Sequence, residues 1–130
     1  MKKILIILFL TYNLSSFSQT QAEMNKDSYL EYNASDKQLN EVYKTILSEY
    51  KTDTLFIENL KKSQRLWIQF RDAEMEMKYP NYPEKMYGSI QPTCRALYLK
   101  ALTDKRIETL NVWVTGIEEG DTCNGSVKII

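Results

Sequence analysis

The chain has 130 residues, with 17 basic and 17 acidic side chains and no histidine. This length suits one domain with a single hydrophobic core. The even charge balance, with no extended basic cluster, argues against nucleic-acid binding, and the absence of histidine removes the commonest metal ligand and general base. We therefore expect no cofactor, no metal site and no enzymatic activity.

The N-terminus has the pattern of a secretory signal peptide. Met1–Lys3 is positively charged, Ile4–Leu10 is apolar, and Thr11–Ser18 is polar with small residues near its end. The apolar run is much shorter than the roughly 20 residues of a membrane span, so we expect no stable membrane anchor after cleavage. We predict a signal peptide over residues 1–18 and a periplasmic or secreted domain over residues 19–130.

Loss of residues 1–18 removes two lysines and no acids, which leaves 15 basic and 17 acidic residues and a net charge of −2. Within the domain, we expect a core over about residues 20–115 and a tail over 116–130. The first helical segment runs from about residue 20 to 50. Residues 33–36 either interrupt it or lie within one long helix, because Ser35 or Asp36 can act as an N-cap. Its apolar residues near helical spacing are Tyr32, Leu39, Val42, Tyr43, Ile46, Leu47 and Tyr50.

A second helical segment is predicted from about residue 54 to 78, after a break at residues 52–54. Its apolar stripe is Leu60, Trp67, Phe70 and Met77, and Pro80 and Pro83 prevent its continuation. A third segment follows from about residue 93 to 114. The pattern indicates an all-α fold, a small antiparallel bundle of three main helices with an irregular C-terminal tail. The third segment's predicted inner face comprises Cys94, Leu97, Leu99, Ala101, Leu102, Arg106, Leu110 and Trp113.

The chain has two cysteines, Cys94 and Cys123. In an exported protein, an even number of cysteines favours a disulfide over free thiols. We predict a Cys94–Cys123 bond, whose loop of about 30 residues would stabilise the fold by roughly 3–4 kcal/mol.

Charged and amide side chains recur at the edges of the predicted apolar faces. Charges near a core need partners, so we expect a structural cluster that fixes the register of the helices. The alternative is that part of this cluster faces a binding groove. The cluster comprises Asp36, Asn40, Arg71, Asp72 and Arg106, beside the predicted core aromatics Tyr43, Trp67 and Phe70.

Acidic and tyrosine side chains are the remaining candidates for functional groups. Two of Asp36, Asp72, Glu74 and Glu76 could form the carboxylate pair of a glycoside hydrolase, but no spacing fixes their separation and they are common helix-surface residues. Among the nine tyrosines, Tyr43 and Tyr98 fit the core. Tyr79, Tyr82 and Tyr87 differ because they lie in or next to a proline-containing loop. They are the better candidates for contact with a partner.

An ordered set of short motifs resembles the family named for the N-terminal domain of the lysozyme inhibitor LprI. The set covers about residues 20–113, nearly the whole predicted mature chain. It consists of Met24-Asn25, Asp36-x-x-Leu39-Asn40-x-x-Tyr43, Gln64-Arg65-x-Trp67-x-x-Phe70-Arg71-Asp72-Ala73, Gly88-Ser89, Cys94 and Leu102-Thr103-x-x-Arg106-x-x-x-Leu110.

The resemblance implies a small exported helical protein that binds and inhibits a lysozyme. Family members usually carry two further cysteines, at the positions of Asp27 and Met75, so a disulfide between the first two helices is absent here. A mildly acidic protein suits cationic lysozymes. The alternative is a binding or structural module of the cell envelope with no lysozyme target, one that recognises another envelope or extracellular protein or a peptidoglycan fragment.

Overall fold

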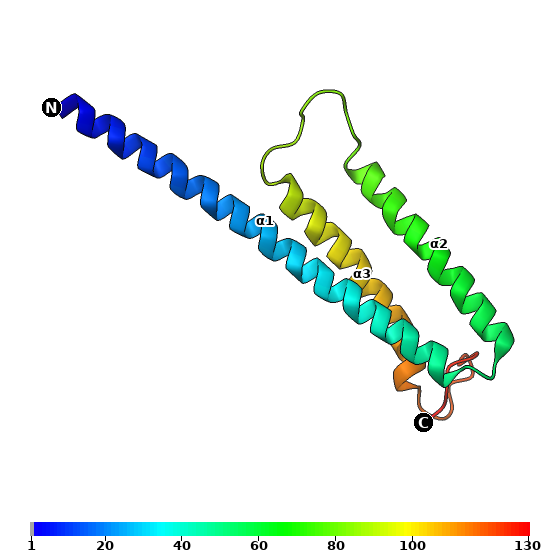
Figure 1. Cartoon of the computed structure of the whole chain (residues 1–130). Coiled ribbons are helices and arrows are strands. Elements are labelled where there is room, and N and C mark those ends of the chain that lie inside the picture. The colour runs from blue at the N-terminus through cyan, green and yellow to red at the C-terminus, as the bar shows by residue number, and fades with distance from the viewer. Residues whose placement is uncertain (1) are drawn as a thin grey trace.

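The protein is a bundle of three helices, as predicted. The computed structural model describes the backbone of residues 2–130 and the side chains of residues 20–130. The helices are α1 (Lys2–Glu49), α2 (Thr54–Lys78) and α3 (Gln91–Thr115), and α2 runs antiparallel to the other two (Figure 1). The predicted signal peptide and its cleavage after Ser18 fall outside the residues whose side chains are described. Within the described part of the chain, no helical stretch has the length and hydrophobicity needed to cross a bilayer.

The first helix is continuous through residues 33–36, so one long helix forms and not two sections. The side chains that could have capped a second section have other partners. Ser35 is buried and hydrogen-bonds Asp104 of α3, while Asp36 faces Arg71 of α2. Because neither side chain turns back to the backbone of the next turn, nothing favours a helix start here.

The third helix packs mainly along α1 and makes much less contact with α2. Small buried side chains explain this difference, since they let two helix backbones approach closely. Ser28 and Ser35 of α1 and Ala96 and Thr103 of α3 are all buried. The face of α2 instead presents longer side chains, Gln64, Trp67 and Met75, and α2 is set apart from the other helices in Figure 1.

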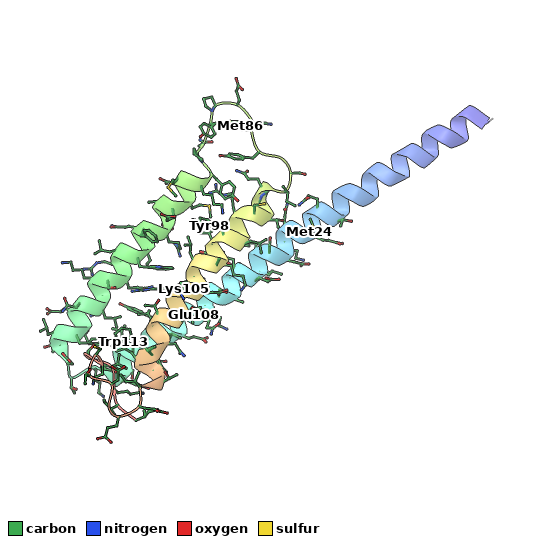
Figure 2. All side chains as sticks on the ribbon, turned by 180° about the vertical axis from the view of Figure 1, so that it is seen from behind. Met24, Met86, Tyr98, Lys105, Glu108 and Trp113 are labelled. Carbon is green, nitrogen blue, oxygen red and sulfur yellow. The ribbon has the colours of Figure 1, made fainter. Side chains whose placement is uncertain are left out.

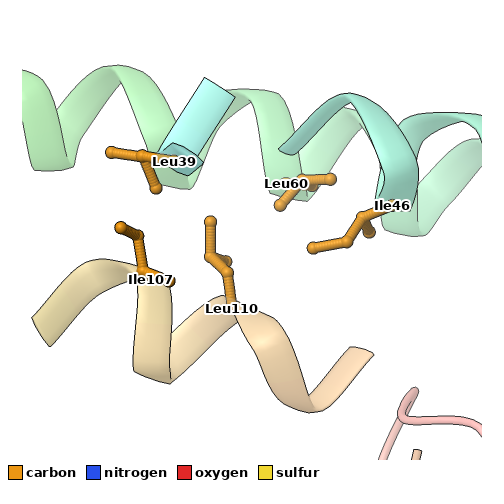
Figure 3. Close-up of a cluster of buried hydrophobic side chains, with 5 residues drawn as sticks. All are labelled: Leu39, Ile46, Leu60, Ile107 and Leu110. Atoms are coloured by element: carbon orange, nitrogen blue, oxygen red, sulfur yellow. The ribbon is translucent and has the colours of Figure 1, made fainter. Parts of the chain in front are cut away.

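One apolar cluster joins all three helices near the end where α1 meets α2. Figure 3 shows its five buried side chains pointing toward one another. Ile46 has no exposed surface and Leu39 only 2%. Tyr43 and Trp67, which were predicted as core aromatics, are partly buried and pack against this cluster. The cluster comprises Leu39, Ile46, Leu60, Ile107 and Leu110.

The prediction that Phe70 fills the core was wrong, because its side chain is 52% exposed, and Met77 is 66% exposed. Trp67 lies about 20° around the helix from Leu60, and Phe70, three residues further on, lies about another 60° in the same direction. By Phe70 the stripe has left the inner face, which Gln64 and Met75 occupy instead. The inner face of α3 also differs from the predicted one. Leu97 is exposed, while Ala96, Thr103, Ile107 and Leu110 are buried.

The C-terminal tail folds back over the end of the bundle. A bridge pairs Ile117 with Ile129, and Gly116 turns the chain with φ of 80° directly after α3. The Tyr50 hydroxyl donates to the Trp113 carbonyl at 3.1 Å and accepts from the Lys128 backbone N–H at 3.0 Å. The tail is therefore held by Tyr50 and by its own backbone, where we had expected Cys123 to hold it.

The predicted Cys94–Cys123 disulfide does not form, and both cysteines are free thiols. Cys94 lies in the first turn of α3, whereas Cys123 lies in the tail beyond the far end of that helix. The intervening helix is about 30 Å long, but the Cα atoms of a disulfide lie within about 7 Å of each other. The even cysteine count therefore misled the prediction.

Candidate partner-binding surface

The connection between α2 and α3, residues 79–90, forms a cluster of three tyrosines that we call the tyrosine loop. The Tyr79 and Tyr87 rings meet edge to face with centroids 5.7 Å apart, and the Tyr82 ring lies 6.4 Å from Tyr87. The Tyr87 hydroxyl donates to the Pro80 carbonyl at 3.2 Å. The structure thus brings together the three tyrosines that were predicted for partner contact.

Asn25 of α1 ties the end of this loop to the bundle. Its side-chain carbonyl accepts from the Thr93 hydroxyl at 2.6 Å and from the Gln21 amide at 3.0 Å. Its own amide donates to the Ser89 carbonyl at 3.5 Å. The loop is therefore fixed to α1 as well as to the two helices that it connects, which limits the conformational entropy that binding would cost.

Cationic side chains lie against the inner side of the tyrosine loop. The Lys78 ammonium lies 5.9 Å from the centroid of the Tyr79 ring and 3.8 Å from that of Tyr98 on α3. The Arg95 guanidinium lies 5.8 Å from the Tyr79 centroid. Burial and the neighbouring Cys94 thiol raise the pKa of Tyr79. These cation–π contacts hold the base of the loop and leave its tip free.

The tip of the loop presents its largest side chains to solvent. Tyr82 is 50% exposed and Met86 is 66% exposed, whereas Tyr79 and Tyr87 are half-buried. Figure 2 shows Met86 on the loop at the end of the bundle opposite Trp113. The exposed surface is therefore a short apolar and aromatic tip on a braced support, with the nearby Lys85 as an exposed cation.

The predicted polar cluster forms in part, around Trp67. The Arg71 guanidinium lies 2.8 Å from the Asp72 carboxylate and 3.6 Å from that of Asp36 on α1. The Asn40 amide donates to the Asp36 backbone carbonyl at 2.9 Å and to its carboxylate at 3.3 Å. The carbon centre of the Arg71 guanidinium lies 5.4 Å from the centroid of the Trp67 ring. Of these contacts, the one between Arg71 and Asp36 joins α2 to α1, and the others lie within a single helix. The structural role of Asp36, Asn40, Arg71 and Asp72 stays a prediction.

Arg106 also lies near Trp67, with its guanidinium carbon 5.9 Å from the ring centroid, but its hydrogen bonds go to other residues than Asp36 or Asp72. Its Nε donates to the Gln64 side-chain carbonyl at 3.0 Å, and its Nη2 donates to the Ser63 hydroxyl at 3.0 Å. Both partners are neutral and lie on α2. Within the described residues, Arg106 forms no ion pair, and burial lowers its pKa.

The carboxylates considered for glycoside hydrolysis have structural partners or lie on the surface. Asp36 and Asp72 share Arg71, and Glu74 accepts a hydrogen bond of 3.0 Å from the Tyr98 hydroxyl. Glu76 is exposed. Residues 20–130 also hold no group of three or more acidic or cysteine side chains that could bind a metal ion. Asp36, Asp72 and Glu74 thus each have a structural partner.

Sequence reasoning missed Asn25, Gln64 and Tyr50, whose amide and hydroxyl groups join separate elements. Asn25 and Gln64 belong to the motifs shared with the LprI family, but those motifs did not indicate which residues these two side chains contact. Tyr50 looked like one more apolar residue on the inner face of α1. No sequence signal indicated that its hydroxyl would bind the tail.

The comparison with known families decides the classification. The family described as lysozyme inhibitor LprI matches residues 14–110, which is well over half of the chain. The chain belongs to the LprI family. No curated protein and no solved structure gave a match. Residues 14–110 of this LprI family member include most of α1, all of α2, the tyrosine loop and most of α3.

Proposed function

We propose that this LprI family member is exported and that it binds a lysozyme and blocks its glycan cleft with the tyrosine loop. The observation that carries the proposal is the family match over residues 14–110. The loop is our choice of contact surface because it combines exposed aromatic and apolar side chains with a braced backbone. Aromatic side chains and methionine are enriched at protein interfaces, and a preformed loop loses little entropy on binding.

The chemistry of the loop tip fits the cleft of a glycoside hydrolase. Such a cleft carries a pair of carboxyl groups, so an exposed cation is favourable there. Lys85 lies between Tyr82 and Met86 and supplies that cation. The net charge of −2 calculated for residues 19–130 acts at longer range and favours encounter with a cationic enzyme. The charge of Lys85 thus favours contact with the cleft, and the net negative charge favours the encounter that precedes it.

The test is inhibition of lysozyme-catalysed lysis of cell-wall substrate by purified residues 19–130. Wild type should inhibit at least one of several lysozymes of different types. Tyr82→Ala and Met86→Ala should each weaken inhibition at least tenfold, because buried anchor residues dominate interface energies. Tyr29→Ala serves as the matched control, since Tyr29 is an exposed tyrosine on α1 away from the loop. Full lysis at saturating protein with every lysozyme would refute the proposal.

A second candidate is a binding module of the cell envelope with no lysozyme target. The observation that favours it is an apolar stripe on α2, where Leu66, Phe70 and Met77 are all more than half exposed. Such a stripe is typical of a protein-binding helix face. This candidate predicts that Phe70→Ser abolishes capture of an envelope partner while lysozyme activity is unaffected by any variant.

A further inference from the structure

A groove lies at the opposite end of the bundle from the tyrosine loop. It has a volume of about 440 Å³ and is formed by the start of α2, the end of α3 and the folded tail. This volume lies in the usual range of small-molecule sites, which is about 300–1,000 Å³. Leu60 and Leu110 reach it from the apolar core, and Ser126 reaches it from the tail. The apolar walls are Leu55, Phe56, Leu60, Leu110 and Trp113.

Arg106 is the cation of this groove, and it lacks an ionic partner. Its hydrogen bonds go to the neutral side chains of Gln64 and Ser63 through Nε and Nη2, and its guanidinium carbon lies 5.9 Å from the Trp67 ring centroid. Among residues 20–130 its Nη1 has no hydrogen-bond partner. Arg71, by contrast, lies within 3.6 Å of two carboxylates. A partly buried charge without a counter-ion is unfavourable, so an anion placed beside Arg106 gains more than one beside Arg71.

The other charged residue of the groove, Asp53, does not neutralise Arg106. Its carboxylate caps α2 by accepting from the Phe56 backbone N–H at 3.0 Å. Ten residues of helix separate it from Ser63, a distance of about 15 Å. The groove therefore has an unpaired cation at one end, apolar side chains along its length and a solvent-exposed capping carboxylate at the other end.

We propose that this groove binds a linear apolar molecule that ends in a carboxylate. The carboxylate contacts Arg106, and the chain runs along the groove over Leu60 and Leu110 toward Phe56 and Trp113. Arg106 and Trp113 are seven residues apart on α3, about 10 Å along the helix, which matches a chain of about eight to ten carbons. The site is separate from the tyrosine loop, so a bound acid and a bound lysozyme would not compete.

The experiment titrates residues 19–130 with decanoate below its micellar concentration and follows heat and tryptophan fluorescence. Saturable binding of one decanoate per chain is expected, with a change in tryptophan emission. Decylammonium has the same chain and the opposite charge, and it should bind at least tenfold more weakly. Arg106→Gln should weaken decanoate binding at least tenfold, whereas Arg65→Gln, an exposed arginine on α2, should leave it unchanged.

A second variant keeps the test informative if Arg106→Gln does not fold. Asn59 is exposed and lines the groove, so Asn59→Trp places a large side chain in the groove and keeps Arg106 itself unchanged. This variant should keep the wild-type circular dichroism spectrum and lose decanoate binding. The proposal is overturned by non-saturable binding, by equal binding of decanoate and decylammonium, or by full binding to folded Asn59→Trp.

Discussion

The substitution Tyr50→Phe tests whether one hydroxyl group holds the C-terminal tail. In the native structure this hydroxyl donates to the Trp113 carbonyl and accepts from the Lys128 N–H, at 3.1 Å and 3.0 Å. Phenylalanine keeps the ring, which packs on Phe56 with centroids 4.8 Å apart, and removes only the oxygen. The change therefore separates hydrogen bonding from core packing.

The magnitude follows from the two bonds. Each intramolecular hydrogen bond contributes about 0.5–1.5 kcal/mol, and both partners are only partly shielded from water, so they can regain some hydration. We expect Tyr50→Phe to lower the free energy of unfolding by about 1–2 kcal/mol. For a domain of this size, that corresponds to a fall in Tm of roughly 4–8 °C. The tail should also become more sensitive to limited proteolysis.

The assay is urea unfolding followed by circular dichroism and by tryptophan fluorescence. The dependence of the unfolding free energy on urea concentration should be the same for wild type and variant. Tyr29→Phe removes the same atom from an exposed tyrosine whose ring packs on Tyr32, and it should change stability by less than about 0.5 kcal/mol. If Tyr50→Phe is as stable as Tyr29→Phe, the hydroxyl does not hold the tail and this account of its anchoring is wrong.

Two further predictions concern the turn at Gly116 and the carboxyl group of Asp104. Gly116→Ala should destabilise the protein by about 1–3 kcal/mol, because the residue has a φ of 80° and a new Cβ would lie 2.6 Å from the tail. Gly88→Ala, with open space around it, should stay within about 0.5 kcal/mol of wild type in the same urea assay. Burial raises the pKa of Asp104, but hydrogen bonds from Lys100 and Ser35 outweigh this effect and hold that pKa below its usual value. Its stabilising effect is thus present above the ordinary carboxyl pKa of about 4 and lost as pH falls below it. Asp104→Asn should therefore be less stable than wild type at pH 7, with a difference that shrinks by pH 3, and a constant difference would contradict this.

The number and order of the helices could be predicted because prolines, capping residues and apolar spacing are local signals. Pro80 and Pro83 ended α2 as expected, and Asp53 caps its first turn. The inner faces were harder to predict. Whether Phe70 or Met75 turns inward depends on the exact helical phase, and Phe70 lies about 60° around the helix from Trp67 although both fit a loose apolar pattern.

Contacts between distant residues were predicted least well. Opposite charges on different helices suggested that Asp36 or Asp72 would pair with Arg71 or Arg106. Arg71 lies near both aspartates, whereas Arg106 hydrogen-bonds Gln64 and Ser63. Likewise, the count of two cysteines carried no information on the length of helix between them. For the site, the proline-containing loop identified its tyrosines, whereas nothing in the sequence indicated the groove, because its walls come from three separate elements.

The small side chains between α1 and α3 have a consequence for the order of folding. The closest packing joins the first and third helices, although α2 lies between them in the sequence. The chain has to close a loop of about 40 residues or more before these contacts form, which costs entropy and slows the search. Destabilising substitutions at Ser35 or Thr103 should therefore slow folding, whereas those on the more loosely packed α2 should mainly speed unfolding.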